Sequence, residues 1–362
     1  MSQQLTGQVL IVGTGLVGTS VGLALSASGV EVRLRDRDSG AVRVAAERGA
    51  GSAEPTSAEP TSDPACVVVA VPPAQVASVV ATVLAEFRSA TVTDVSSVKR
   101  EPLSTLAASV DGDSLSRYVG GHPMAGSELS GPWAATAELF QGRAWAVTPH
   151  AGSSPAAVEV VTALATSTGA VAVTMTPDEH DVAVARVSHL PHLLSVLAAA
   201  QLGGAPAEHL ALSGQGLRDV TRVAAGDPTL WGQILTANAT AVRELLRGVR
   251  ADVDELLAGL GDDSSDRVGD VLQRAVAGTR RIPAKHGGPA RAEAVVVVAL
   301  PDRPGELARL FGDAGQSGVN VEDLRIDHDP GRPVGLVELV VQAPAADTLV
   351  DALVARGWSA HR

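Results

Sequence analysis

Short apolar runs alternate with amphipathic segments along the first half of the chain. The runs that have the length and pattern of β-strands lie at 8–13, 30–36, 66–72, 90–97, 118–124, 143–149 and 170–175. The run at 66–72 is apolar and rich in β-branched residues throughout, as expected of a strand that is covered on both faces. Helical periodicity separates most of these runs, so the pattern predicts a parallel, doubly wound α/β sheet.

From Pro177 the pattern becomes almost entirely helical. Pro177 and Asp178 begin a predicted helix that continues to about residue 203, with Pro191 expected to kink it because proline lacks a helix N–H. Asp227 and Pro228 begin another, since Asp caps helices and Pro suits the first turn. Helical signals continue to about residue 280, which predicts an all-helical domain.

A Pro/Gly-rich linker at 282–292 follows, and the last segment has the pattern strand, helix, strand, strand, helix. We therefore expect an α/β domain at 1–176, a helical domain at 177–281 and a small α+β domain at 293–362. A chain of 362 residues is long enough for two or three domains.

Composition narrows the class of protein. The net charge of −12 and an aromatic content of 2% disfavour a nucleic-acid partner, which needs basic and stacking side chains. The single cysteine, Cys66, excludes an intrachain disulfide and suits a reducing compartment. We read no signal peptide at the N-terminus and no apolar run of the ~18 residues that a span needs, so we expect a soluble, cytoplasmic protein without a membrane partner.

The first strand and helix are joined by GTGLVG, which has the spacing GxGxxG. In this spacing the first glycine makes the turn, the second admits a pyrophosphate and the third lets helix and strand pack closely, while the helix N-terminus attracts the anion. The motif thus predicts a Rossmann-type dinucleotide-binding domain whose cofactor-binding residues include Gly13, Gly15, Leu16, Val17 and Gly18.

Asp36 ends the second predicted strand, where a carboxylate binds a ribose 2′-hydroxyl. That carboxylate favours NAD, because it would repel the 2′-phosphate of NADP. Arg35 and Arg37 flank it and could accommodate the phosphate, so NADP stays an alternative.

Two polar segments follow neighbouring strands at the carboxyl edge of the sheet, where open α/β folds bind ligands. Ser97 lies in TDVSSVK and His122 in GGHPMAGSE, so both could face one crevice. A histidine can accept a proton near neutral pH. We interpret His122 as a base or hydrogen-bond acceptor beside a hydride acceptor; a turn histidine satisfied by the backbone is the alternative.

The helical domain holds further candidates. His189 and His192 are three residues apart and share a helix face at the predicted kink, and Arg218 and Arg222 share another, with Asp219 nearby. An arginine fork suits a carboxylate. Satisfied helix histidines and a solvated salt-bridge face are the structural alternatives. We expect no metal site, because no third ligand has suitable spacing.

Taken together, the segments resemble the prephenate/arogenate dehydrogenase family of tyrosine biosynthesis. The resemblance rests on GTGLVG, DVSSVK, GGHPMAGSE, SHLPHLLS and LRDVTRVAAGDPTLW, which occur in this order across 8–280. It implies an NAD-dependent oxidoreductase that decarboxylates prephenate to 4-hydroxyphenylpyruvate. It also implies a homodimer formed through the helical domain.

The resemblance assigns roles residue by residue. His122 and Ser97 would contact the ring hydroxyl, Arg222 held by Asp219 would bind a substrate carboxylate, and the pocket would include His192, His189 and Glu128. The C-terminal segment, with LPDRPGELARLF and GVNVEDL, resembles an ACT domain (βαββαβ). That implies an amino-acid effector, tyrosine, near Gly305, Glu306 and Asn320, although such a fold can also serve assembly alone.

Three other functions stay open. Arogenate differs from prephenate only by an amino group in place of a keto group, and no residue that we read decides between them. A dinucleotide-binding sensor would need neither Ser97 nor His122. A β-hydroxyacid dehydrogenase uses a lysine acid in its helical domain, and 177–250 contain no lysine.

Overall fold

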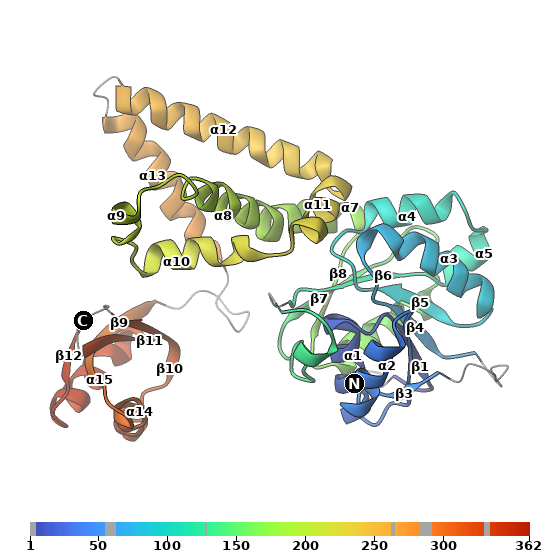
Figure 1. Cartoon of the computed structure of the whole chain (residues 1–362), viewed down its shortest axis with the longest axis horizontal. Coiled ribbons are helices and arrows are strands. Elements are labelled where there is room, and N and C mark those ends of the chain that lie inside the picture. The colour runs from blue at the N-terminus through green and yellow to red at the C-terminus, as the bar shows by residue number, and fades with distance from the viewer. Residues whose placement is uncertain (1–4, 55–62, 127–128, 262–264, 283–291, 329–333) are drawn as a thin grey trace. The chain divides into compact units, whose positions relative to one another are not determined.

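The computed structural model describes residues 5–54, 63–126, 129–261, 265–282, 292–328 and 334–362 (Figure 1). The chain divides into two compact units, 1–253 and 254–362, with the division inside helix α12 (Ala239–Gly261). The predicted linker at 282–292 lies almost wholly outside the described residues.

A five-stranded parallel sheet forms the base of the first unit, in the order β3-β2-β1-β4-β5. Its strands are β1 (Val9–Val12), β2 (Val32–Arg35), β3 (Ser52–Ala53), β4 (Cys66–Val69) and β5 (Thr91–Asp94). This order is that of a dinucleotide-binding sheet, in which the chain returns to the centre after β3. The predicted Rossmann-type sheet is confirmed.

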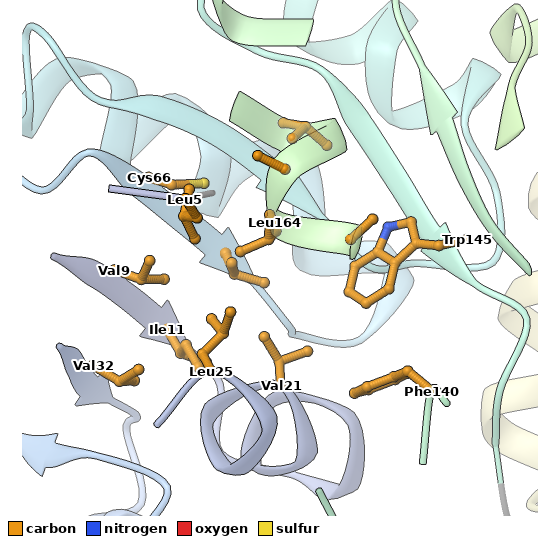
Figure 2. Packing of buried hydrophobic residues seen from close by; sticks show 14 of the residues in the cluster. Leu5, Val9, Ile11, Val21, Leu25, Val32, Cys66, Phe140, Trp145 and Leu164 are labelled. Atoms are coloured by element: carbon orange, nitrogen blue, oxygen red, sulfur yellow. The ribbon is translucent and has the colours of Figure 1, made fainter. Parts of the chain in front are cut away.

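Two apolar clusters cover the two faces of this sheet. Side chains such as Val9 and Ile11 pack on one face against helices α1 (Leu16–Ala27), α2 (Ser39–Glu47) and α6 (Pro155–Ser167), as Figure 2 shows in part. Leu10 points to the opposite face, against α3 (Val76–Glu86) and α4 (Arg100–Ala107). Burial on both faces explains why these strands are apolar throughout.

A second sheet continues the fold with β6 (Gly120–Pro123), β7 (Ala144–Thr148) and β8 (Val171–Thr174). A parallel bridge from Val92 to Tyr118 connects β5 to the start of β6. The expectation of parallel strands throughout is wrong here, because β6 and β7 pair antiparallel. The described part of the connection between them holds a 3-10 turn (Pro132–Ala134) and no α-helix of the kind that usually joins parallel strands.

The predicted long helix runs from Pro177 to Ala200 as α7 (Pro177–Val184), a π-helical turn (Ala185–His189) and α8 (Leu190–Ala200). A Thr176–Glu179 capping box begins it. The ring of Pro191 would clash with the carbonyl four residues earlier in a regular α-helix. The wider π turn precedes it and provides the room.

Shorter helices follow along the chain. They are α9 (Ala207–Leu210), α10 (Gln215–Thr221), a 3-10 turn (Arg222–Ala225), α11 (Pro228–Ala237), α12 and α13 (Ser265–Thr279). Asp227 caps α11 by accepting a hydrogen bond from the Thr229 amide at 2.9 Å, as the Asp-Pro pair predicted.

The helix Pro177–Ala200 has the length and the mean hydropathy, 1.4 over its best window, of a membrane span. The expectation that no segment reaches such a length is therefore wrong, because charged residues at wide intervals hardly lower the average. Several of those residues are buried within the first unit, including His180, Asp181 and His189. Buried ionisable side chains with partners in the same unit are typical of a core helix rather than of a span.

The second unit ends in an antiparallel sheet of order β10-β11-β9-β12. Its elements are β9 (Glu293–Pro301), α14 (Glu306–Gln316), β10 (Val321–His328), β11 (Val334–Gln342), α15 (Ala346–Val354) and β12 (Ser359–His361). The pattern strand, helix, strand, strand, helix is confirmed, with β12 added at the edge. Leu310 and Leu349 pack from the two helices onto the sheet.

Candidate active site

In the glycine turn at 13–18, Gly13 and Gly18 pack closely against backbone, whereas Gly15 faces open space. Gly13 has φ +106°, and a Cβ there would overlap the Ala70 carbonyl. A Cβ at Gly18 would overlap the Gly13 carbonyl. A Cβ at Gly15 would meet nothing within 4 Å, and Gly15 is the N-cap of α1, with no side chain to occupy the free N–H groups. The open side of the turn therefore fits a pyrophosphate.

The carboxylates around β2 distinguish the two nicotinamide cofactors. Asp36 accepts hydrogen bonds from the Thr14 amide at 2.6 Å and the Thr14 hydroxyl at 3.1 Å, which holds it beside the glycine turn. Arg35 is bound by Glu54 and by Glu86, whose hydrogen bonds raise the pKa of the guanidinium further. Arg35 is thus already paired, and of the two arginines that flank Asp36, Arg37 is the exposed one that could meet a 2′-phosphate.

Substituting Gly15 with alanine is expected to weaken NAD binding at least tenfold while leaving the unfolding midpoint within about a degree. The added methyl group meets open space in the protein but occupies the position where the pyrophosphate approaches the backbone. Gly18→Ala is the matched control, because its methyl group overlaps backbone and should lower stability as well. Calorimetric titration with NAD and thermal unfolding measure the two effects; equal NAD affinity in wild type and Gly15→Ala would contradict this use of the turn.

His122 lies in β6 and is buried. The two glycines before it let the strand cross a polar cluster at close range: a Cβ at Gly120 would come within 2.9 Å of the Lys99 side chain, and one at Gly121 within 2.8 Å of the Asp94 carbonyl. The glycines thus serve packing beneath the histidine. Our expectation that they admit substrate and nicotinamide has no support in these contacts.

That polar cluster joins three side chains within the core. The Lys99 ammonium is paired with the Asp94 carboxylate, and both are almost fully buried. The Tyr118 hydroxyl donates to the other Asp94 oxygen at 2.6 Å. Burial lowers the pKa of Lys99 against the opposing effect of Asp94, and burial together with Asp94 raises the pKa of Tyr118. The cluster holds the loop that carries Ser97 against β6.

His122 contacts a second histidine that the sequence analysis missed. His122 Nδ1 lies 2.9 Å from His180 Nε2, and His180 Nδ1 lies 2.8 Å from Asp181 Oδ1. His180 precedes Asp181 in the predicted helix PDEHD, and nothing in the apolar pattern separated it from ordinary helix-start residues. The feature that could have identified His180 in the sequence is the adjacent histidine–aspartate pair in the first turns of a predicted helix.

Burial sets the protonation of these histidines. It lowers the pKa of His122 well below its ordinary value, and nearby His180 and Lys99 lower it further. Burial also lowers the pKa of His180, although Asp181 acts in the opposite direction. His122 is therefore neutral at pH 7 and can accept a proton or a hydrogen bond.

A cavity of about 330 Å³ opens among the π turn, α8 and the segment 222–231. His192 lies in its wall and stacks on Trp231, with ring centroids 3.5 Å apart. Arg222 also lines it, is exposed, and has no acidic partner among the residues that the structure describes. The structure thus brings the predicted His192 and Arg222 together. His189 is buried close to both His192 and His122, and burial lowers its pKa to about 4.

Other predicted residues are placed differently. Ser97 is half-buried and makes no hydrogen bond within the described ranges, and the bond to His122 that the family resemblance implies is therefore not formed in the substrate-free chain. Asp219 accepts a hydrogen bond from Gln215 at 2.8 Å, and no ion pair joins it to Arg222 within the described ranges. Glu128 lies outside the described residues.

The three predicted effector residues lie at the start of α14 and before β10. Gly305 is the N-cap of α14 with φ +89°, a left-handed conformation that suits glycine. Glu306 pairs with Arg309 at 2.7 Å, and exposed Asn320 donates to Glu322 at 3.1 Å.

A dinucleotide turn and a buried neutral histidine in one compact unit define a nucleotide-dependent oxidoreductase. Two family models match the chain: "Prephenate dehydrogenase, nucleotide-binding domain" over 21–174 and "Prephenate dehydrogenase, dimerization domain" over 176–274. The chain belongs to the prephenate dehydrogenase family.

Relatives support this membership. The "Probable prephenate dehydrogenase NovF" of Streptomyces niveus is 37% identical and spans 97% of this chain and 99% of its own. The prephenate dehydrogenase of Bacillus subtilis is 26% identical over 89% of each chain. Among solved structures, that of prephenate dehydrogenase from Aquifex aeolicus with hydroxyphenyl propionate and NAD+ is 26% identical, with a TM-score of 0.67 over 77% of this chain and 98% of that one.

Proposed function

We propose that this chain is an NAD-dependent prephenate dehydrogenase that converts prephenate to 4-hydroxyphenylpyruvate and carbon dioxide. The observation that carries the proposal is the buried, neutral His122, held by His180 in the same unit as the open glycine turn. The family membership and the two curated relatives named above support the same activity.

Each site residue has a separate role in the proposed reaction. The glycine turn would hold NAD, which would supply the hydride acceptor for the ring carbon that carries the hydroxyl. The ring carboxylate would leave as carbon dioxide, and the electrons of its bond would enter the ring. His122 accepts the hydroxyl hydrogen, or a hydrogen bond from it, as the carbonyl forms there. Arg222 and His192, in the wall of the 330 Å³ cavity, orient a carboxylate of the substrate. Ser97 contacts the ring hydroxyl once substrate is bound.

The choice of NAD over NADP rests on two carboxylates. Asp36 is held at the end of β2, where it would repel a 2′-phosphate. Arg35, the nearest cation along the strand, is bound by Glu54 and Glu86 instead. NADP would have Arg37 alone among the cations of this strand end.

Replacing Arg222 with alanine is expected to raise KM for prephenate by about 10-fold to 100-fold with little change in kcat, because charge-assisted hydrogen bonds to a carboxylate contribute about 1.5–3 kcal/mol. Initial-rate kinetics at saturating NAD measure it. Arg218→Ala is the matched control, since Arg218 is exposed on α10 and is not part of the cavity wall. An unchanged KM in Arg222→Ala, or an equal rise in both variants, would remove Arg222 from carboxylate binding.

The protein acts as a cytoplasmic homodimer formed through the helical domain. Apolar side chains of α8 are exposed in the single chain, among them Leu194 and Leu197. The family model for 176–274 is that of a dimerization domain. Burial of this surface in a dimer is consistent with the apolar helix Pro177–Ala200, of whose most apolar window only 28% is buried within one chain.

The C-terminal sheet is an ACT domain that binds tyrosine as effector. The βαββαβ connectivity and the strand order β10-β11-β9-β12 support this assignment. The effector would contact the left-handed turn at Gly305, with Glu306 and Asn320 beside it.

NAD reduction by the purified protein tests these proposals together. Four pairings are compared, prephenate or arogenate with NAD or NADP, each with and without tyrosine. Turnover with prephenate and NAD above the other pairings is expected, with a change of rate on adding tyrosine. Arogenate is a real competitor, since a solved arogenate dehydrogenase from Synechocystis is also 26% identical over 75% of this chain and 98% of that one, with a TM-score of 0.61. Turnover with arogenate alone would transfer the function to that substrate.

A further inference from the structure

We propose that His180 and Asp181 are positioning residues that hold His122 in one tautomer, with the proton on Nδ1 and the lone pair on Nε2. The kinetic consequence rests on the proposed function, whereas the tautomer itself does not. His122 would then present a ready acceptor without any change of its own protonation.

The argument starts at Asp181, whose carboxylate can only accept. Its Oδ1 accepts a hydrogen bond from the Lys99 amide at 2.9 Å, and its Oδ2 accepts one from the Arg100 amide at 2.9 Å. These bonds, with the one from His180, keep the pKa of Asp181 below its ordinary value although burial acts to raise it. An ionised carboxylate 2.8 Å from His180 Nδ1 requires that nitrogen to carry a proton.

The next link is His180. Its pKa is lowered by burial, so at neutral pH it carries one ring proton, already assigned to Nδ1. Its Nε2 is therefore an acceptor. His122 Nδ1 lies 2.9 Å from that atom and must supply the proton. The planes of the two rings are inclined at 68°, which an N–H···N bond permits.

The remaining nitrogen of His122, Nε2, is thus the unprotonated one. It has no hydrogen-bond partner among the described residues. The same network joins β6, α7 and the start of α4, and Asn238 secures it by donating to the Asp181 carbonyl at 2.7 Å. The tautomer is set by the bond that the other ring nitrogen makes, a general property of histidine.

Two substitutions of His180 distinguish the loss of its hydrogen bonds from a change in the shape of the side chain. His180→Leu removes both hydrogen bonds, while His180→Gln keeps an acceptor and a donor on one planar amide. We expect His180→Leu to lower kcat by about 10²-fold or more, since a base in the wrong tautomer is a poor acceptor. KM for prephenate and the Kd for NAD should change less than threefold, and His180→Gln should recover most of kcat.

The pH profile separates a change of tautomer from a change in the pKa of His122, whereas the comparison with His180→Gln separates it from loss of packing. The two tautomers of neutral His122 hold the same number of protons, so the loss in His180→Leu should be equally large across the whole plateau of kcat against pH. Equal losses in His180→Gln and His180→Leu, or full activity in His180→Leu, would overturn the proposal.

Nitrogen-15 spectra of the substrate-free protein, labelled at histidine, test the tautomer directly. The His122 signals are those missing from His122→Asn. We expect a protonated Nδ1 and an unprotonated Nε2 in the wild type. A protonated Nε2 would overturn the proposal whatever the kinetics. The expected tautomer in a protein that fails to oxidise prephenate would instead count against the proposed function alone, and the test holds even if His180→Leu does not fold.

Discussion

Replacing His122 with asparagine is expected to lower kcat by about 10²–10⁴-fold, the usual contribution of a positioned acid or base. Asparagine fits the buried site, and its amide can still donate to His180, but it lacks a basic nitrogen. Because His122 is not part of the glycine turn, the Kd for NAD should stay within about twofold. Initial-rate kinetics and calorimetric titration with NAD measure the two quantities.

The pH dependence follows from the same burial. The pKa of His122 is well below 6.5, so the basic form persists as the pH falls and the acid limb of kcat/KM should lie below that value. Histidines with a lowered pKa bind fewer protons folded than unfolded, so their contribution to stability is present above ~6.5 and is lost as the pH falls. Near-normal turnover in His122→Asn, or an acid limb above 6.5, would remove His122 from catalysis.

Replacing Lys99 with methionine is expected to lower the stability of the first unit by about 3–5 kcal/mol, the cost of leaving a buried charge without its partner. Asp94 is fully buried and would keep only the hydrogen bonds from the Ser96 amide and the Tyr118 hydroxyl. Thermal unfolding and urea titration, followed by far-UV circular dichroism, measure the change.

The matched control is the double variant Asp94→Asn and Lys99→Met. The amide of asparagine can accept from the Ser96 amide and donate to the Tyr118 oxygen, so the site stays hydrogen-bonded without any charge. We expect the double variant to be more stable than Lys99→Met alone. If the double variant proved no more stable, the unpaired charge of Asp94 would not be the cause.

Much of the fold follows from local rules that a sequence displays directly. The glycines of GTGLVG predicted the first turn because each answers a separate steric need, and the structure places each Cβ direction accordingly. The start of α11 could be predicted equally well, since the cap Asp227 and the first-turn residue Pro228 both affect only the first turn of the helix. The antiparallel pairing of β6 and β7 could not be predicted in this way, because the relative direction of two strands depends on the path of the chain between them.

The residues of the site likewise fall into those that the sequence could predict and those that it could not. His122 and Arg222 could be named because their residue types suit the chemistry and their neighbours in sequence are unusual. His180 was missed, since its role depends on a contact with His122 across 58 positions of the chain. The expected support of Arg222 by Asp219 stays a prediction: in the substrate-free chain Asp219 is hydrogen-bonded to Gln215.

The sequence by itself determined the class of fold, the dinucleotide turn and the residue type at the centre of the chemistry, because each depends on neighbours within a few positions. Only the tertiary structure decided how His122 is protonated, which cation is already neutralised beside Asp36, and why two glycines precede the histidine. Those properties come from burial and from partners on other elements, such as Asp181 on α7, Glu86 on α3 and Lys99 beneath β6. A linear pattern holds no record of which distant side chains meet, and desolvation by those neighbours is what sets charge and tautomer.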